Sequence, residues 1–535
     1  MRPRGGAPDP VSQGQRSSGI LASDASPEGG ARMPPASHDR DFDLVVRGGL
    51  LATAAETFEA DLAIRDGRIA AIGRALRPGA EEIDAKGLVV TPGGLDPHCH
   101  IEEPSEAGGV QEESFASGSA AALAGGTTSF ICFVPQWKGH PIARTAPGYE
   151  ARARASRADY GFHQIITDPT PEVLEREVPA LVARGIRSLK VFLTYDPLRL
   201  TDGQYLEVLA TARRLGALVT VHCENFDAIG WRIRALLAAG LTDPLQHAWA
   251  RPPVVEREAT HRAIALAELV DQPIQIFHVS CDEAAEEIAR ARARGVKVWG
   301  ETCPQYLTLS TEDLARPDFE GAKVVCSPAL RAPAERERIW ARIADGTLDI
   351  VSSDHCGFSF ATAKRDPGSS GYGQGGAEAR PDGMPAFNAI PNGVPGIETR
   401  LPLLFSEGVS KGRIDLPTFV RLTSANAARL FGLAGRKGTL APGADADLVL
   451  WDPSAERRIR NAALHHAIDY TPWEGLAVTG WPATVIRRGE VAVRDGAVLA
   501  EPGSGRFLAR GPYPLVRPTG RVPDGFDAAA VPPRS

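Results

Sequence analysis

The sequence lacks a long apolar run, a long basic run and a regular cysteine pattern, and each absence excludes a class of protein. No apolar stretch approaches the roughly 18 residues of a membrane-spanning helix, so we expect no membrane partner. A formal charge of −7 without a basic run gives no reason to expect nucleic acid as a partner. Seven cysteines, an odd number without regular spacing, do not describe a disulfide framework.

The N-terminal segment also lacks the apolar core of a signal peptide. Residues 1–35 are instead rich in Pro, Gly and Ser. We therefore expect a disordered tail and a cytoplasmic protein, and an alternative start at Met33 would remove residues 1–32. The remaining composition, 43% hydrophobic and 23% charged over the whole chain, is that of a soluble globular protein.

Short alternating strands separated by turn residues occur near both ends of the chain. From residue 43 the sequence reads "DLVVRGGLL" and then "DLAIRDGRIAAIG", in which Asp66-Gly67 between two apolar runs is a hairpin signal. The pattern returns near the C-terminus in "DADLVLWD" and "ATVIRRGEVAVRDGAVLA". We predict that these two β-rich ends form one small domain.

Between these ends, strands and helices alternate. Helical stretches such as "QYLEVLATARRLG" separate most of the strands, which indicates parallel βαβ units. Eight such units favour a (β/α)8 barrel, an α/β fold, over a doubly wound open sheet. The eight strand-like runs are the one before His98 and then residues 127–135, 161–167, 186–195, 217–223, 273–280, 296–302 and 349–355.

Polar side chains recur at the carboxyl ends of these strands. In "TPGGLDPHCH" the two histidines share one face, because strand side chains two apart point the same way. In a barrel all strand ends of this kind converge on the face where active sites are built. The series consists of His98 and His100 after the first strand, Lys190 in the fourth, and His222, His278 and Asp354 at the ends of the fifth, sixth and eighth.

Four imidazoles and a carboxylate at one rim are the donor set of a divalent metal centre. Neutral imidazole and carboxylate suit zinc, and two ions about 3.5–4 Å apart can share a hydroxide nucleophile near neutral pH. Taken singly, a histidine in an apolar strand is more often a core residue than a ligand, and Asp354 could cap a loop. Lys190 is harder to explain, because an unpaired buried charge is costly. It becomes a ligand only if its amine is converted to an anionic oxygen donor, such as a carbamate formed with carbon dioxide.

Four cysteines lie close to these candidate ligands in the sequence and raise the alternative of a thiolate site. Cys99 and Cys223 each directly neighbour a histidine, so strand alternation points them away from it. We predict buried, reduced thiols for these two and for Cys281 and Cys356.

The chain resembles the amidohydrolase superfamily, and within it the dihydropyrimidinase and D-hydantoinase group of cyclic amidases. The resemblance runs from about Asp43 to Pro512 and rests on motifs in family order, among them "GGLDPHCH", "LKVFLTY", "VHCEN", "FHVSC", "ETCPQYLTL", "SSDHCGF" and "IPNGVPGIETRLPLLFSEGV". It implies a barrel flanked by a β-sandwich, and a homotetramer. The predicted division is a tail over residues 1–40, sandwich over 41–90, barrel over 91–438, sandwich over 439–512 and a second tail over 513–535.

The resemblance also implies the metal ligands. It implies two divalent ions, zinc by expectation, and N6-carboxylysine at position 190 as a bridge between them. The first ion is expected on His98, His100 and Asp354 and the second on His222 and His278, with Lys190 shared.

Further residues receive roles from the same resemblance. Asp354 is expected to be the general base, which takes a proton from the attacking hydroxide and hands it to the leaving nitrogen. Tyr195, in "FLTY", is expected to assist the developing oxyanion. Ser327 and Asn392 correspond to positions that hold the cyclic amide, largely through main-chain groups.

The expected substrate class follows from a missing arginine. Dihydroorotases and allantoinases usually carry an arginine within a residue or two after H-x-H, and in dihydroorotase it pairs with the substrate carboxylate. Here Ile101, Glu102 and Glu103 follow, and we expect these carboxylates to repel a charged substrate. A neutral ring is therefore expected, such as 5,6-dihydrouracil or a 5-substituted hydantoin. The alternatives are another cyclic ureide or lactam, such as allantoin, and a non-catalytic scaffold, although scaffold relatives have lost ligands that are present here.

Two segments depart from the family pattern. Residues 358–386 carry a Gly-rich excess, which we interpret as a longer loop at the mouth of the site, where loops shape specificity. The stretch "EEPSEAGGVQEES" is more polar than the corresponding run in hydantoinases and predicts either a more polar substrate or a differently packed lid.

Overall fold

The computed structural model describes residues 41–106, 110–366, 379–522 and 525–527. The expected tail over residues 1–40, much of the one over 513–535 and part of the Gly-rich loop therefore lie outside the described residues. Among the helices in the described ranges, none combines the length and the apolar character that crossing a membrane requires.

Eight parallel strands pair in chain order and close into a ring. The last strand is split: β13 (Ile350–Val351) pairs with the seventh strand, and β14 (His355–Cys356) pairs with the first. This closed order confirms the predicted barrel and excludes the open sheet. The first seven strands are β6 (Gly94–His100), β7 (Thr127–Val134), β8 (Asp159–Ile165), β9 (Ser188–Phe192), β10 (Leu218–His222), β11 (Ile274–Ile276) and β12 (Val298–Thr302).

Helices connect successive strands, and their ends follow local sequence signals. At the start of α4 (Asp202–Leu215), Thr201 Oγ1 accepts from Gln204 N and the Gln204 side chain accepts from Thr201 N. The helix ends at Gly216 in the left-handed conformation, with φ of 63°.

The other connecting helices are α1 (Phe115–Ala124), α2 (Ala146–Ala153), α3 (Val178–Ala183), α5 (Phe226–Ala238), α6 (Gln246–Ala250), α7 (Pro253–Leu269), α8 (Asp282–Ala293), α9 (Pro304–Thr308), α10 (Thr311–Leu314) and α11 (Pro333–Ala344). After β14 come α12 (Arg400–Leu404), α13 (Leu416–Val420) and α14 (Asn426–Leu430).

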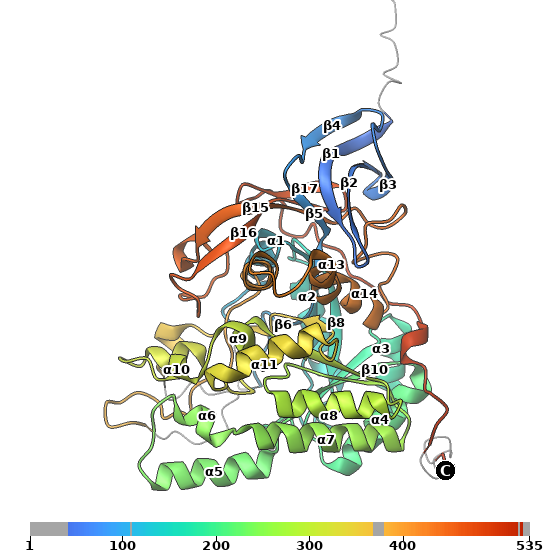
Figure 1. Cartoon of the computed structure of the whole chain (residues 1–535). Coiled ribbons are helices and arrows are strands. Elements are labelled where there is room, and N and C mark those ends of the chain that lie inside the picture. The colour runs from blue at the N-terminus through green and yellow to red at the C-terminus, as the bar shows by residue number, and fades with distance from the viewer. Residues whose placement is uncertain (1–40, 107–109, 367–378, 523–524, 528–535) are drawn as a thin grey trace, which may run out of the picture. The chain divides into compact units, whose positions relative to one another are not determined.

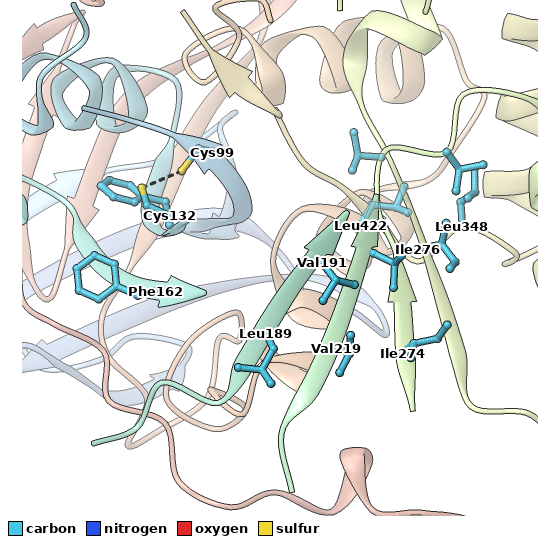
Figure 2. Packing of buried hydrophobic residues seen from close by; sticks show 14 of the residues in the cluster. Cys99, Cys132, Phe162, Leu189, Val191, Val219, Ile274, Ile276, Leu348 and Leu422 are labelled. Carbon is cyan, nitrogen blue, oxygen red and sulfur yellow. Dashed lines mark hydrogen bonds between the residues drawn. The ribbon is translucent and has the colours of Figure 1, made fainter. Parts of the chain in front are cut away.

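Strand alternation sorts the side chains of β9 between two layers. Leu189 and Val191 belong to the apolar layer that also holds Val219 of β10 and Ile276 of β11 (Figure 2). Lys190, between them, must therefore point to the opposite face of the sheet, the interior of the barrel. The strand thus buries a lysine because its two neighbours are needed in the core.

The cysteines are all free, as predicted. Cys99 and Cys132 lie in the same apolar layer, with their Sγ atoms 3.4 Å apart (Figure 2). Cys223 and Cys281 are also buried there. Cys356 differs from the prediction because it is only partly buried and lines the cavity described below.

Both ends of the chain contribute to one second sheet, which confirms the predicted β domain (Figure 1). The join is β5 (Val89–Pro92), which pairs in parallel with β1 (Phe42–Ala52) and antiparallel with β15 (Leu448–Arg458). The remaining strands are β2 (Thr57–Arg65), β3 (Arg68–Gly73), β4 (Gly79–Asp84), β16 (Ala477–Arg487), β17 (Glu490–Arg494) and β18 (Ala497–Val498).

A buried cluster of charges links this sheet to the barrel. Lys437 Nζ lies 2.7 Å from Asp159 at the start of β8, 2.6 Å from Asp447 and 3.1 Å from Asp445, both shortly before β15. Burial works to lower the pKa of Lys437, but the three carboxylates outweigh it and raise that pKa. The lysine therefore stays charged and holds three acidic groups that would otherwise repel one another.

Replacing this lysine tests whether the cluster stabilises the fold. Lys437→Met leaves Asp447 buried without its cation and leaves Asp159 with Arg488 alone, so we expect the free energy of unfolding to fall by about 3–5 kcal/mol in urea denaturation. The control is Lys411→Met, which removes a largely exposed lysine paired with Glu407 and should cost at most about 1 kcal/mol. Equal, small losses in both variants would contradict a role for the cluster.

Candidate active site

A cavity of about 460 Å³ lies at the carboxyl ends of the barrel strands. The structure brings every residue expected at the site to its wall, although strands and loops far apart in the sequence supply them. These residues are His98, His100, Lys190, Tyr195, His222, His278, Ser327, Asp354 and Asn392.

The first group of potential ligands is His98, His100 and Asp354. One donor atom from each side chain lies within 4.8 Å of the others. His98 Nε2 is 3.0 Å, and His100 Nε2 is 3.6 Å, from the same Asp354 Oδ1. Two imidazoles converging on one carboxylate oxygen form a donor set that suits zinc or a similar divalent ion.

The second group is His222 and His278, which lie beside the first. Their ring centroids are 4.3 Å apart, and the centroid of His278 is 5.3 Å from that of His98. His278 Nδ1 is buried and forms no hydrogen bond with any described residue. Burial lowers the pKa of both rings, so they are neutral near pH 7, the form that binds metal.

Lys190 is fully buried among these groups and its amine has no hydrogen-bond partner in the described part of the chain. Its Nζ lies over three aromatic rings, 4.3 Å from the centroid of Phe277, 4.7 Å from Phe192 and 5.6 Å from Phe133. Burial lowers the pKa of Lys190 to about 8. Because a buried polar group without a partner is costly, this amine needs a partner in the cavity or a chemical modification.

A carboxylate bonds one ring nitrogen of each of three histidines, and in His98 and His100 the other nitrogen faces Asp354. Such partners fix the orientation and tautomer of a metal-binding histidine and raise its basicity. The pairs are His98 Nδ1 with Glu301 Oε1 at 2.7 Å, His100 Nδ1 with Glu103 Oε1 at 2.7 Å, and His222 Nε2 with Glu224 Oε2 at 2.8 Å.

The sequence interpretation did not predict that these carboxylates hold histidines, although two kinds of signal exist. Glu103 and Glu224 follow a candidate ligand by three and two residues. Glu301 lies in β12, at the same rim as the ligands, in a strand that contributes no ligand of its own. The structure also corrects the expected repulsion by Glu102: its carboxylate accepts from Phe115 N at the start of α1 and does not line the cavity.

Three site residues have a backbone conformation that is unusual for residues other than glycine. The φ angles are 66° at Tyr195, 41° at His278 and 47° at Asp354. Strain of this kind is kept where a side chain must be aimed at a functional site. Tyr195 is further fixed by Asn392, whose Nδ2 donates to the Tyr195 hydroxyl over 3.4 Å.

The rest of the cavity wall combines apolar and polar side chains. Trp137, Ile165 and Leu198 supply apolar surface, whereas Ser105 and Glu106 come from the polar stretch that departs from the family pattern. Lys190 is the only lysine or arginine among the described residues of the wall. A substrate carboxylate would therefore find no cationic fork to bind it.

Comparison with known proteins agrees with this geometry. The model of the amidohydrolase family matches residues 89–492. A D-hydantoinase of Geobacillus stearothermophilus is 45% identical over 472 residues, which cover 88% of this chain and 97% of that protein. A crystal structure of D-hydantoinase has a TM-score of 0.82 at 44% identity, covering 88% of this chain and 99% of the other. The dihydropyrimidinase from Brevibacillus agri NCHU1002 has the same TM-score and coverage at 42% identity.

Glu301 offers a test of the ligand assignment that leaves the ligands themselves in place. Glu301→Gln keeps the size of the side chain but replaces the carboxyl group that bonds His98 Nδ1, so we expect metal affinity to fall about 10–100-fold. Competition with a chelator measures this. Glu102→Gln is the control and should bind metal like the unchanged chain. Unaltered affinity in Glu301→Gln would mean that Glu301 does not support a metal ligand.

Proposed function

This chain belongs to the amidohydrolase family, and we propose that it opens the cyclic amide bond of dihydropyrimidines or 5-substituted hydantoins to give N-carbamoyl amino acids. The observation that carries this proposal is the convergence of four imidazoles, Asp354 and the unpartnered amine of Lys190 in a cavity without a cationic fork. The relatives named D-hydantoinase, which this chain matches over most of its length, support hydrolysis of a cyclic amide.

The donor set of the cavity fits two divalent ions, which we infer to be zinc from the ligand types. When bound, the ions supply Lewis acidity, which activates water near neutral pH and polarises a carbonyl group. The proposed ligands are His98, His100 and Asp354 for one ion and His222 and His278 for the other.

Lys190 completes this set as N6-carboxylysine. The neutral amine forms an N–C bond with carbon dioxide and releases one proton, so an uncharged amine becomes an anionic carbamate whose oxygens would serve both ions. Full burial, the absence of a partner and a pKa lowered to about 8 all support this modification, because they make the neutral amine accessible near neutral pH.

Asp354 is positioned to move the proton. It accepts a proton from the attacking water as the water oxygen bonds to the ring carbonyl, and returns it to the ring nitrogen as the C–N bond breaks. In the chain alone, burial raises the pKa of Asp354, against the opposing effect of the charges of His100 and Lys190. A divalent ion beside it would favour the carboxylate form, which is the form that accepts a proton.

Three residues bind and orient the substrate in this proposal. The Tyr195 hydroxyl donates to the developing oxyanion, and it stays protonated because burial raises its pKa above the ordinary value of a phenol. Main-chain groups of Ser327 and Asn392 hold the two sides of the cyclic amide.

A second candidate is a more polar cyclic ureide of the allantoin type, which the polar rim at Ser105 and Glu106 favours. A scaffold without activity is the weaker alternative, because the candidate ligands are all present and lie together. A homotetramer and a cytoplasmic location remain predictions.

The test combines metal content with turnover of dihydrouracil, hydantoin, allantoin and dihydroorotate on the same sample. We expect about two zinc ions per chain, opening of the first two rings and no opening of dihydroorotate. Lys190→Ala should lose metal and reduce turnover by more than about 100-fold. This is a larger loss than that expected from removing a carboxylate that only holds a histidine. Metal without turnover of any ring would mean that the metal site is right and the proposed substrate class is wrong. No metal and no turnover would overturn the proposal.

A further inference from the structure

A second buried lysine lies close to the cavity and has no part in the proposed reaction. Lys364 ends the π-helical turn η4 (Phe360–Lys364) and its side chain has no exposed surface. Its Nζ donates to the main-chain oxygens of Val325 and Pro391, each 3.1 Å away. No carboxylate of the described residues forms an ion pair with it, and the titratable groups near it include the thiols of Cys326 and Cys356 and the imidazole of His247.

The two carbonyls belong to the two loops that carry the substrate-binding candidates. Val325 precedes Ser327 by two residues, and Pro391 directly precedes Asn392. The loops also meet directly, since Gly393 N donates to Val325 O over 3.0 Å. Lys364 therefore lies where the loops come together, behind the wall of the cavity.

The main-chain groups of Ser327 and Asn392 themselves are left available. Within the described part of the chain, no hydrogen bond reaches the backbone N–H or C=O of either residue. A ring amide is held cis, so its N–H and C=O point to the same side. The protein must therefore offer an acceptor for the N–H and a donor for the C=O at a fixed spacing. The distance between the two loops therefore sets how well such a ring is bound.

Other contacts hold the Ser327 loop independently of Lys364. Cys326 O accepts from His247 Nε2, and Pro328 O accepts from Tyr306 Oη, each over 2.8 Å. Loss of Lys364 would leave these tethers and the Gly393–Val325 bond in place, so its specific contribution is the second link, from Val325 O to Pro391 O.

We propose that Lys364 is a positioning residue whose amine joins the carbonyls of Val325 and Pro391 and so sets the spacing of the main-chain groups that bind the cyclic amide. This inference rests on the proposed function. Burial lowers the pKa of Lys364 to about 7, so a large share of the amine is neutral at neutral pH. A neutral amine has two N–H donors, one for each carbonyl.

Lys364→Met removes both donors while keeping an unbranched side chain of similar length. We expect KM for hydantoin and dihydrouracil to rise about tenfold, with kcat and zinc content close to those of the unchanged chain, because lost binding common to ground and transition states raises KM alone. Lys364→Arg retains the donors and should recover part of the loss. The control is Lys323→Met, in the turn that leads to Val325. Its partly exposed amine bonds Glu320 at 2.6 Å, so the variant should leave both constants unchanged.

The outcomes separate positioning from a purely structural role. An unchanged KM in Lys364→Met, with only a lower melting temperature, overturns the proposal, and so does a loss of zinc together with activity. If the Met variant does not fold, Lys364→Gln is measured in its place, because its shorter amide cannot reach both carbonyls, and an unchanged KM there also overturns the proposal. An unchanged chain that opens none of the rings overturns the proposed function and this inference together.

Discussion

The burial of Lys190 without a counterion is the constraint on which the rest of the site depends. The core of the barrel requires Leu189 and Val191 on the outer face of β9, so alternation leaves Lys190 inside. An ammonium group there is desolvated and unpartnered, which is costly. The proposed conversion to an anionic ligand would remove the cation and supply negative charge beside the four imidazoles and one carboxylate that are the candidate ligands of two divalent ions.

The closure of the barrel and the geometry of the site use the same residues. Asp96 Oδ1 accepts from His98 N on β6 and from Ser353 N on the eighth strand, each over 3.2 Å. The split of that strand into β13 and β14 leaves Asp354 outside regular pairing, with a positive φ that turns its carboxylate toward His98 and His100. The residues that close the ring of strands therefore also orient the candidate ligands.

Much of this arrangement could be predicted from the sequence, because it follows from local periodicity. The eight strands, the β domain shared by both ends and the inward face of His98 and Lys190 all come from patterns within a few residues. The roles of the site residues are still proposals, but their convergence on one rim follows from the fold alone. The position of Glu301 at the end of β12 indicated only that it lies at the rim; that it bonds His98, about 200 residues away in sequence, depends on side-chain packing that the sequence pattern does not give. The contacts of Lys364 were not predicted either, because only the folded chain brings its amine to the carbonyls of two distant loops.

The central claim is that Lys190 works as a carbamate, and ¹³C NMR of the protein reconstituted with zinc and ¹³C-bicarbonate tests it most directly. The account predicts a single protein-bound carbamate resonance that is absent from Lys190→Met, which keeps the apolar stem but has no amine. Full zinc content and full turnover without that resonance would contradict the account.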